Sequence, residues 1–353
     1  MSRFFSSKYK LLTPYTPGEQ PKDARKYTKL NTNESPFPPS EAAMAYARSH
    51  TRPLNLYSDP TVSELTALLA ERYGVAPDQV LVTNGSDEIL NFAFMAFCDS
   101  AHPAAFPDIT YGFYPVFARL NGVPYREIPL EDDFSINPKS YFGIGHTIFI
   151  ANPNAPTGKY LAISDIAAIL EANPDNVVVV DEAYIDFGGE SAICLLKDHP
   201  NLLVAQTFSK SRSMAGARLG YGIGSPALIA DLNTIKYSTN PYNINSMSIA
   251  AGIGILKDRA YTDKCCAIIR ENRVYLTQAL EKRGFTMPDS LANFVFARHP
   301  DIDGAMLYSS LKARGVLVRH FELPRIRDYN RITIGTREQL DTLLAATDEI
   351  LRG

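Results

Sequence analysis

The chain has 353 residues, of which 45% are apolar and 21% charged, and its 35 basic and 38 acidic side chains leave a formal net charge of -3. This length predicts about two domains with a sizeable core, and the ordinary apolar content excludes a largely disordered chain. The even charge balance argues against a nucleic-acid partner, and no apolar run approaches the ~20 residues of a membrane-spanning helix.

The cysteines and the first residues narrow the class further. Four cysteines are too few and too irregularly spaced for a disulfide framework, and the adjacent Cys265 and Cys266 lack metal-ligand spacing. Residues 1–12 contain three basic side chains but no apolar stretch and cleavage site of a secretion signal. We therefore expect a cytoplasmic globular protein with no metal site and no membrane partner.

The first 40 residues differ from the rest, because they contain six prolines and show no helical or strand period. Such a segment is either a disordered tail or an arm that lies over a neighbouring surface. The pattern changes at Thr61, where Thr61 and Glu64 have capping-box spacing and leucines follow at helical intervals as far as Gly74.

Short apolar runs then alternate with helical segments. We expect strands at 80–83, 147–151, 177–180, 202–205 and 220–224, and helices at 87–97 and 165–171. This alternation predicts βαβ units and a mostly parallel sheet flanked by helices over residues 41–248. Residues 249–353 show a different order of predicted elements, with helices at 258–283, 303–314 and from 337, and strands at 293–296, 316–319 and 331–334. They predict a smaller α+β C-terminal domain.

Ligands of parallel sheets bind at the carboxyl ends of the strands, where this chain places polar residues. Lys210 follows one predicted strand, with Thr207 and Ser209 before it and Arg218 after it. These hydroxyl and guanidinium donors suit a phosphate, and a desolvated lysine beside fixed cations becomes a nucleophile for Schiff-base chemistry. The alternative for Lys210 alone is a solvated surface charge.

Further candidates follow two other predicted strands, and one more lies at Tyr111. Asp181 ends a run of four valines, so it is either an N-cap or the acidic partner of a protonated ring nitrogen. Tyr184 could direct its hydroxyl to the same ligand, and Tyr111 could stack on a flat ring, although both could be core aromatics. Gly85 and Ser86 open a helix whose free N–H groups could receive a phosphate.

These motifs, in order, resemble the fold-type I, pyridoxal-phosphate-dependent aminotransferases of class I and II. The resemblance rests on Asn152 to Gly158, Asp181 to Tyr184 and Ser209-Lys210 with Gly216, Arg218 and Gly220. More narrowly, the chain is similar to the histidinol-phosphate aminotransferases, through segments at 14–20, 30–34, 56–57, 84–88, 110–112 and 331–338. The similarity spans nearly the whole chain.

The resemblance implies a role for each matched residue. Lys210 would form the Schiff base with pyridoxal 5'-phosphate, Asp181 would hold the pyridine nitrogen, Tyr184 would contact the ring hydroxyl and Tyr111 would stack on the ring. Five groups would cradle the cofactor phosphate: Gly85, Ser86, Thr207, Ser209 and Arg218. Tyr57 would reach the cofactor phosphate of the other subunit, which implies a homodimer with shared sites.

One position departs from the family pattern. The family usually has Asn immediately before Pro-Thr-Gly, and this chain has Ala155 there. Either Asn154 substitutes for it or Tyr184 alone serves the ring oxygen.

The resemblance also predicts the substrate. Arg331 would meet its acidic group, and a second arginine, Arg319, suits a dianionic phosphate better than a single carboxylate. Residues 1–40 would form an arm over the active site, with Tyr15 and Asn33 contacting substrate, residues 41–248 the cofactor-binding domain, and residues 249–353 the small domain.

The implied reaction converts L-histidinol phosphate and 2-oxoglutarate into imidazole-acetol phosphate and L-glutamate, in histidine biosynthesis. Two alternatives on the same fold are an aromatic amino-acid aminotransferase and a threonine-phosphate decarboxylase. A non-enzymatic regulatory module would need a DNA-binding region, for which the 40-residue arm is too short and too rich in proline.

Overall fold

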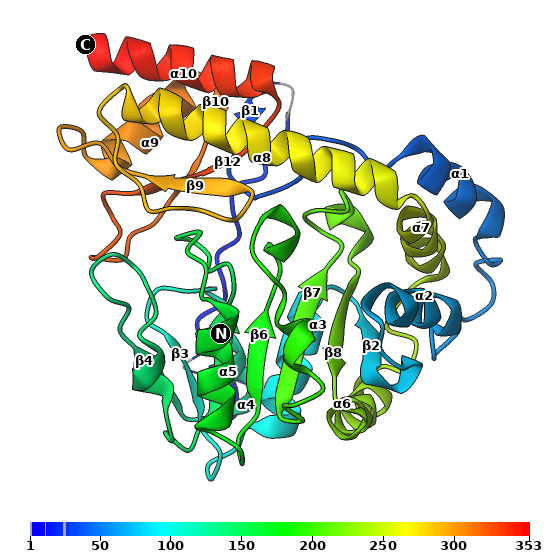
Figure 1. Ribbon diagram of the computed structural model, residues 1–353. Coiled ribbons are helices and arrows are strands. Elements are labelled where there is room, and N and C mark those ends of the chain that lie inside the picture. The colour runs from blue at the N-terminus through cyan, green and yellow to red at the C-terminus, as the bar shows by residue number, and fades with distance from the viewer. Residues whose placement is uncertain (1, 11, 24–25) are drawn as a thin grey trace.

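The computed structural model describes residues 2–10, 12–23 and 26–353 (Figure 1). Its main element is a seven-stranded sheet in the order β2-β8-β7-β6-β5-β3-β4. The strands are β2 (Val80–Thr83), β3 (Ala104–Pro107), β4 (Tyr125–Ile128), β5 (Thr147–Ala151), β6 (Val178–Asp181), β7 (Leu202–Thr207) and β8 (Gly220–Gly224). β8 runs antiparallel to both its neighbours, β2 and β7, and the other pairs are parallel. The predicted mostly parallel sheet is confirmed.

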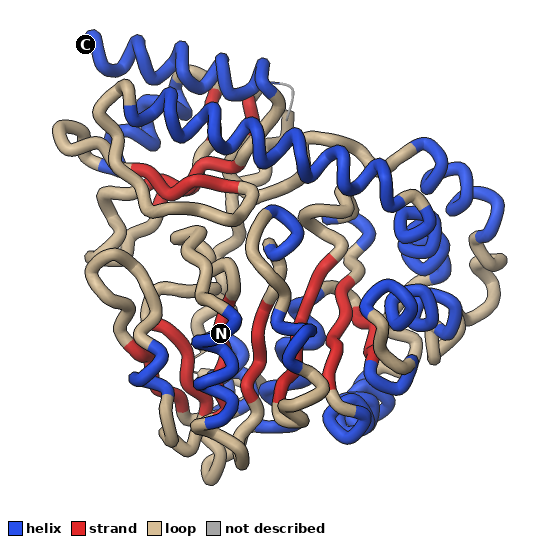
Figure 2. The backbone as a smooth tube through the Cα atoms, viewed as in Figure 1, coloured by secondary structure: helices blue, strands red, loops and turns tan. Residues whose placement is uncertain are grey.

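Helices cover both faces of this sheet, as Figure 2 shows. Alternate strand residues such as Val178 and Val180 pack with α1 (Glu41–His50), α2 (Ser63–Tyr73), α5 (Ile163–Glu171) and α7 (Ser246–Lys257). The residue between them, Val179, packs on the opposite face with α3 (Ser86–Phe97), α4 (Tyr114–Asn121) and α6 (Pro226–Thr239). Because both faces are buried, the strands are continuously apolar, which is typical of parallel sheets.

A second core lies in the C-terminal part of the chain. A three-stranded antiparallel sheet has the order β11 (Arg319–His320), β12 (Asn330–Thr333), β9 (Phe294–Ala297), and β1 (Thr28–Lys29) pairs with β10 (Val316–Leu317). The helices α8 (Arg259–Glu281), α9 (Gly304–Ala313) and α10 (Arg337–Arg352) accompany them. In Figure 1 this group lies at one end of the large sheet. The domain limits at residues 40 and 248 stay a prediction.

Several elements differ from expectation for identifiable reasons. The proposed Thr61 capping box is wrong: Val62 is the N-cap of α2, and the Asp59 carboxylate instead accepts from the N–H groups of Thr61 and Ser63, both at 2.9 Å. The expected strand at 316–319 is divided into β10 and β11. β3 and β4 were not expected, because β3 contains no β-branched residue and β4 is an edge strand with two charged residues.

None of the described helices is both long enough and apolar enough to cross a bilayer. Residues 1, 11 and 24–25 of the expected arm lie outside the described residues. The rest of the arm makes contacts with the body. For example, the Lys312 amine on α9 donates to the Glu19 carboxylate at 2.7 Å. The described part of the arm therefore lies in contact with the body of the protein, which agrees with the second of the two alternatives given above.

Candidate active site

Two adjoining cavities, each of about 260 Å³, lie at the carboxyl ends of the parallel strands. The inner cavity is lined by eight of the predicted site residues: Ser86, Tyr111, Asp181, Tyr184, Thr207, Ser209, Lys210 and Arg218. The outer cavity is lined by Tyr15, Asn33, Arg319 and Arg331, together with the apolar side chains of Phe321, Leu323 and Ile326. Lys210, Tyr111 and Tyr184 line both cavities, so the fold brings the expected nucleophile to their junction.

Lys210 lies three residues beyond β7, in a segment without regular secondary structure. Its Nζ donates to the Thr32 carbonyl oxygen at 3.4 Å and lies 5.9 Å from the centroid of the Tyr184 ring. Burial lowers the pKa of Lys210 to about 8, and the nearby positive charge of Arg331 adds to this effect. A lysine with this pKa is partly neutral near physiological pH, and the neutral amine is the nucleophilic form.

Asp181 is the last residue of β6 and is 5% exposed. Its carboxylate accepts from the Tyr114 hydroxyl at 3.1 Å and from the Ala183 N–H at 3.2 Å. Burial raises the pKa of Asp181 to about 7 despite these donors. Such a carboxylate would gain from a cationic partner in the inner cavity, and a protonated ring nitrogen is one.

Anion-binding groups gather at the start of α3. Gly85 is the N-cap with φ of 83°, and a Cβ there would lie 2.7 Å from an Arg218 nitrogen. Only glycine allows both this backbone conformation and the close approach of the guanidinium. Arg218 Nη1 also lies 3.4 Å from the Ser209 hydroxyl, which in turn accepts from Thr207 at 3.0 Å. Free N–H groups, two hydroxyls and a guanidinium therefore converge, as a phosphate requires.

The side chain of Asn154 forms hydrogen bonds within the protein and lines neither cavity. Its amide donates to the Ile109 carbonyl oxygen and the Thr157 hydroxyl, both at 3.0 Å, and accepts from the Thr110 hydroxyl at 2.8 Å. The next residue, Ala155, lines both cavities. Its hydrogen-bonding groups are thus used to hold the loop.

Tyr184, by contrast, lines both cavities. Its hydroxyl accepts from the Asn33 amide at 3.0 Å, and the ring meets Phe294 edge-on. Asn33 has φ of 55° and is held through two hydrogen bonds with Thr333. Asn33 thereby connects the N-terminal arm, β12 and Tyr184.

The two predicted substrate arginines lie directly opposite each other on the antiparallel strands β11 and β12. Like charges in this register are unfavourable without an anion between or beside them. Arg331 Nη2 donates to the Asn31 carbonyl oxygen at 3.3 Å, but its buried Nε has no hydrogen-bond partner among the described residues. Arg319 instead donates to the carbonyl oxygens of Thr16 and Pro17, at 3.1 and 3.2 Å, and so fastens the arm.

Of the other aromatic site candidates, Tyr111 and Tyr15 line the cavities and Tyr57 does not. The Tyr111 hydroxyl donates to Asp87 at 2.6 Å, and Tyr15 stacks on Phe113 with 4.3 Å between ring centroids. Tyr57 lies outside both cavities: it is 76% exposed and stacks on Tyr242. Within one chain, therefore, Tyr57 and Asn154 are the two predicted side chains that the fold does not bring to the cavities.

Two contributors were missed in the sequence. Tyr114 supplies the hydroxyl donor of Asp181, and Asp87 joins Tyr111 to Arg218, whose Nη2 lies 3.2 Å from its carboxylate. The position of Asp87 in the first turn of a helix beside Gly85-Ser86 was a usable signal. The contact of Tyr114 with β6 depends on how α4 packs and had no local signature.

Comparisons of this sequence with a family model and with known proteins all indicate the same family. The sequence model of the family "Aminotransferase class I and II" matches residues 25–346. Histidinol-phosphate aminotransferase of Aromatoleum aromaticum is 47% identical, with all of both chains covered, and histidinol-phosphate aminotransferase 2 of Dechloromonas aromatica is 48% identical over 99% of each chain.

A solved structure shares the fold. The histidinol-phosphate aminotransferase of Sinorhizobium meliloti, crystallised with pyridoxal-5'-phosphate, superposes with a TM-score of 0.84 at 23% identity. The match covers 92% of this chain and 90% of that one.

Proposed function

Because this chain belongs to the class I and II aminotransferase family, we propose that it transfers the amino group of L-histidinol phosphate to 2-oxoglutarate. The products are imidazole-acetol phosphate and L-glutamate, as in histidine biosynthesis. The observation that carries this substrate is the opposed pair Arg319 and Arg331, in which a buried guanidinium nitrogen lacks a partner. A dianionic phosphate offers both arginines an acceptor, whereas one carboxylate suits a single arginine.

The proposed cofactor is pyridoxal 5'-phosphate, and the inner cavity fits it in three independent ways. The Lys210 amine would bond to its aldehyde, Asp181 would pair with its ring nitrogen, and the group around Arg218 and the N-terminus of α3 would hold its phosphate. When bound, this cofactor supplies an electron-withdrawing ring that stabilises negative charge on the neighbouring carbon. Tyr184 is left to serve the ring oxygen alone, because the Asn154 amide is used elsewhere.

The protein's own groups then have distinct tasks. The Lys210 Nζ, which burial keeps partly neutral, can take a proton from the substrate carbon and deliver it to the cofactor carbon on the other side of the nitrogen that joins them. The Asp181 carboxylate holds the proton on the ring nitrogen, because a cation beside it restores the charged form that burial disfavours. Asn33 orients the Tyr184 hydroxyl.

Substrate binding belongs to the outer cavity. Histidinol phosphate has its phosphate where an amino acid has its α-carboxylate, so Arg331 and Arg319 would receive it. 2-Oxoglutarate would use the same arginines in the second half of the reaction. Tyr15 and the rest of the arm would cover the bound substrate and reduce the access of water.

The complete site is proposed to need a second copy of this chain. Tyr57 stacks on Tyr242, and Leu54 and Leu56 precede it in the chain; all four of these apolar side chains are at least 43% exposed. Surface patches of this kind commonly mark protein interfaces. In a homodimer Tyr57 would reach the partner's cofactor phosphate. The free cysteines suit the reducing cytoplasm, where we place the enzyme.

A substrate panel with 2-oxoglutarate as acceptor, assayed for glutamate and for CO₂, tests the assignment. We expect histidinol phosphate to yield glutamate without CO₂ and to react at least about a hundredfold faster, in kcat/KM, than histidinol lacking the phosphate. A preference for phenylalanine would establish the aromatic aminotransferase instead. Release of CO₂ from threonine phosphate would establish the decarboxylase.

A further inference from the structure

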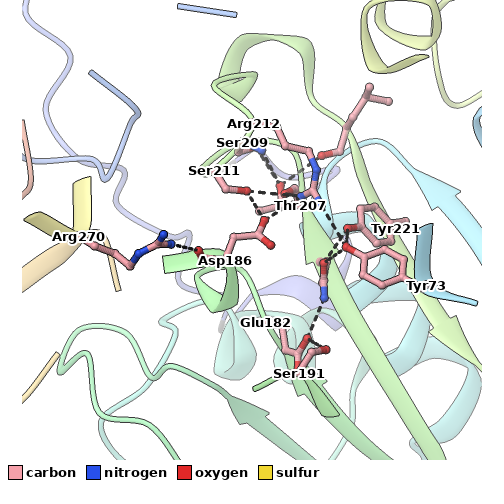
Figure 3. Close-up of polar contacts among 12 residues, drawn as sticks. Tyr73, Glu182, Asp186, Ser191, Thr207, Ser209, Ser211, Arg212, Tyr221 and Arg270 are labelled. Carbon is pink, nitrogen blue, oxygen red and sulfur yellow. Dashed lines mark hydrogen bonds and ion pairs between the residues drawn. The ribbon is translucent and has the colours of Figure 1, made fainter. Parts of the chain in front are cut away.

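A buried polar cluster lies next to the Lys210 segment, on the side of the large sheet away from Asp181. Figure 3 shows its polar contacts. It consists of Tyr73, Glu182, Asp186, Gln206, Arg212 and Tyr221. Successive strand residues face opposite sides of a sheet, so Glu182 points away from the face to which Asp181 points. None of the six lines either cavity, and the chemistry described above uses none of them.

Arg212 is the centre of this cluster and is 2% exposed. Its Nη1 lies 3.2 Å from the Thr207 carbonyl oxygen and 3.2 Å from Asp186 Oδ2, and its Nη2 donates to the Tyr73 hydroxyl at 3.0 Å. The planar guanidinium also lies over the Phe208 ring, 5.0 Å from its centroid. One side chain thus joins the end of β7, the segment after Tyr184 and helix α2.

The polar chain continues from Tyr73 to a second carboxylate. The hydroxyls of Tyr73 and Tyr221 both donate to Gln206 Oε1, at 2.8 and 2.6 Å, and Gln206 Nε2 donates to Glu182 at 2.8 Å. The Ser191 hydroxyl and the Ala192 N–H also donate to the Glu182 carboxylate, at 2.6 and 2.7 Å. Tyr73, which accepts from Arg212, is therefore itself held in place by hydrogen bonds.

The Lys210 segment is closed by two internal backbone hydrogen bonds, from the Met214 N–H to the Phe208 carbonyl oxygen at 3.1 Å and from the Ser213 N–H to the Lys210 carbonyl oxygen at 3.3 Å. Residues 208–214 form neither helix nor strand, and Ser213 has a left-handed φ of 57°. Side-chain contacts hold both neighbours of Lys210: the Ser209 N–H donates to the Thr207 hydroxyl at 3.1 Å, and the Ser211 hydroxyl donates to Asp186. Asp186 is the same carboxylate that pairs with Arg212, so loss of the guanidinium would remove the group that fixes the acceptor of the Ser211 hydroxyl, and would also remove the hydrogen bond to the Thr207 carbonyl oxygen.

Burying a guanidinium costs free energy, and well-packed apolar residues would avoid this cost. The presence of Arg212 at this buried position therefore points to a role other than stabilising the fold. We propose that Arg212 is a positioning residue, which fixes the Lys210 segment and holds the Lys210 amine at the junction of the two cavities. This inference rests on the proposed role of Lys210. Arg212 touches neither substrate nor cofactor in it.

The decisive variant is Arg212→Lys, because it keeps the positive charge and removes the planar fork. The control is Arg273→Lys, the same change at a partly buried arginine that donates to the carbonyl oxygens of Phe187 and Ala292, at 3.2 and 2.6 Å. Should Arg212→Lys fail to fold, Ser211→Ala removes only the hydroxyl that joins the segment to Asp186.

The readout is the pH dependence of acetylation of Lys210 in the full-length chain before cofactor is added, followed by mass spectrometry. Wild type and the Arg273 control should show a midpoint near the Lys210 pKa of about 8. In Arg212→Lys the freed amine gains water, so we expect a midpoint of about pH 9 and about a tenfold smaller reactive fraction below it. Ser211→Ala should shift the midpoint in the same direction by less.

With cofactor loaded, Arg212→Lys should lower kcat about tenfold and leave KM for histidinol phosphate nearly unchanged. An unchanged labelling midpoint in both Arg212→Lys and Ser211→Ala would overturn the proposal and leave Arg212 as a structural residue. Failure of the proposed function is recognised separately, because wild-type protein would then form no reducible bond between Lys210 and pyridoxal phosphate.

Discussion

Replacing Arg331 by glutamine tests how the outer cavity recognises its substrate. Arg331 is partly buried, donates only one hydrogen bond from Nη2 within the described part of the chain, and has a buried Nε without a partner there. A bound phosphate can accept two charge-assisted hydrogen bonds from this guanidinium. Each contributes at least about 1.5 kcal/mol, so the loss of both costs about 3 kcal/mol of binding free energy. This corresponds to about a 150-fold fall in kcat/KM for histidinol phosphate.

The assay compares histidinol phosphate with histidinol, which lacks the phosphate, in wild type and in Arg331→Gln. The variant should lose about 150-fold on the phosphate ester and only a few fold on histidinol, because the latter never made the bonds. Arg314→Gln, at an exposed arginine paired with Glu349 on the surface, is the matched control and should leave both values unchanged. Equal losses on the two substrates would refute the reasoning, because Arg331 would then support the fold or the reacting geometry in general.

The remaining predictions concern the buried network, the dimer and the arm. Burial raises the pKa of Glu182 to about 7, above its ordinary value of 4.5, so the folded state holds the proton more tightly and loses up to about 3 kcal/mol of stability as pH rises from about 4.5 to 7. Denaturant unfolding of Glu182→Gln should lack this slope, and an identical pH profile in both proteins would contradict the assignment. Mixing Lys210→Ala with Tyr57→Phe subunits should give more activity than the two proteins assayed apart, because one site of a mixed dimer has both native side chains, and no gain would count against the shared site. Arg319→Ala should weaken the binding of histidinol phosphate more than that of phenylalanine, and should make proteolysis of residues 12–23 faster, because two hydrogen bonds to the arm are lost. Equal weakening of both substrates, with an unchanged rate of cleavage, would indicate that Arg319 neither selects the phosphate nor holds the arm.

Much of the arrangement could be predicted because it follows from local order along the chain. Asp181 ends a run of four valines, Lys210 lies three residues beyond β7, and the carboxyl ends of parallel strands meet at one edge of a sheet. The left-handed Gly85 before a helix likewise marks the anion site with residues adjacent in sequence.

The parts that could not be predicted depend on packing between distant segments. The amide of Asn154 is turned away from the cavity by the carbonyl of Ile109 and the hydroxyl of Thr110, more than 40 residues earlier in the chain. Tyr114 reaches Asp181 only once α4 is packed on the sheet. The charged edge strand β4 carries no apolar alternation, so its sequence resembles that of a loop.

Chemical trapping at a single lysine tests the account most directly. The purified full-length protein is incubated with pyridoxal 5'-phosphate, reduced with borohydride, digested and mapped by mass spectrometry. The account predicts loss of the yellow colour and one added phosphopyridoxyl group on the peptide that contains Lys210, with no activity in Lys210→Ala. Stable incorporation at a different lysine, or full transamination by Lys210→Ala, would contradict it.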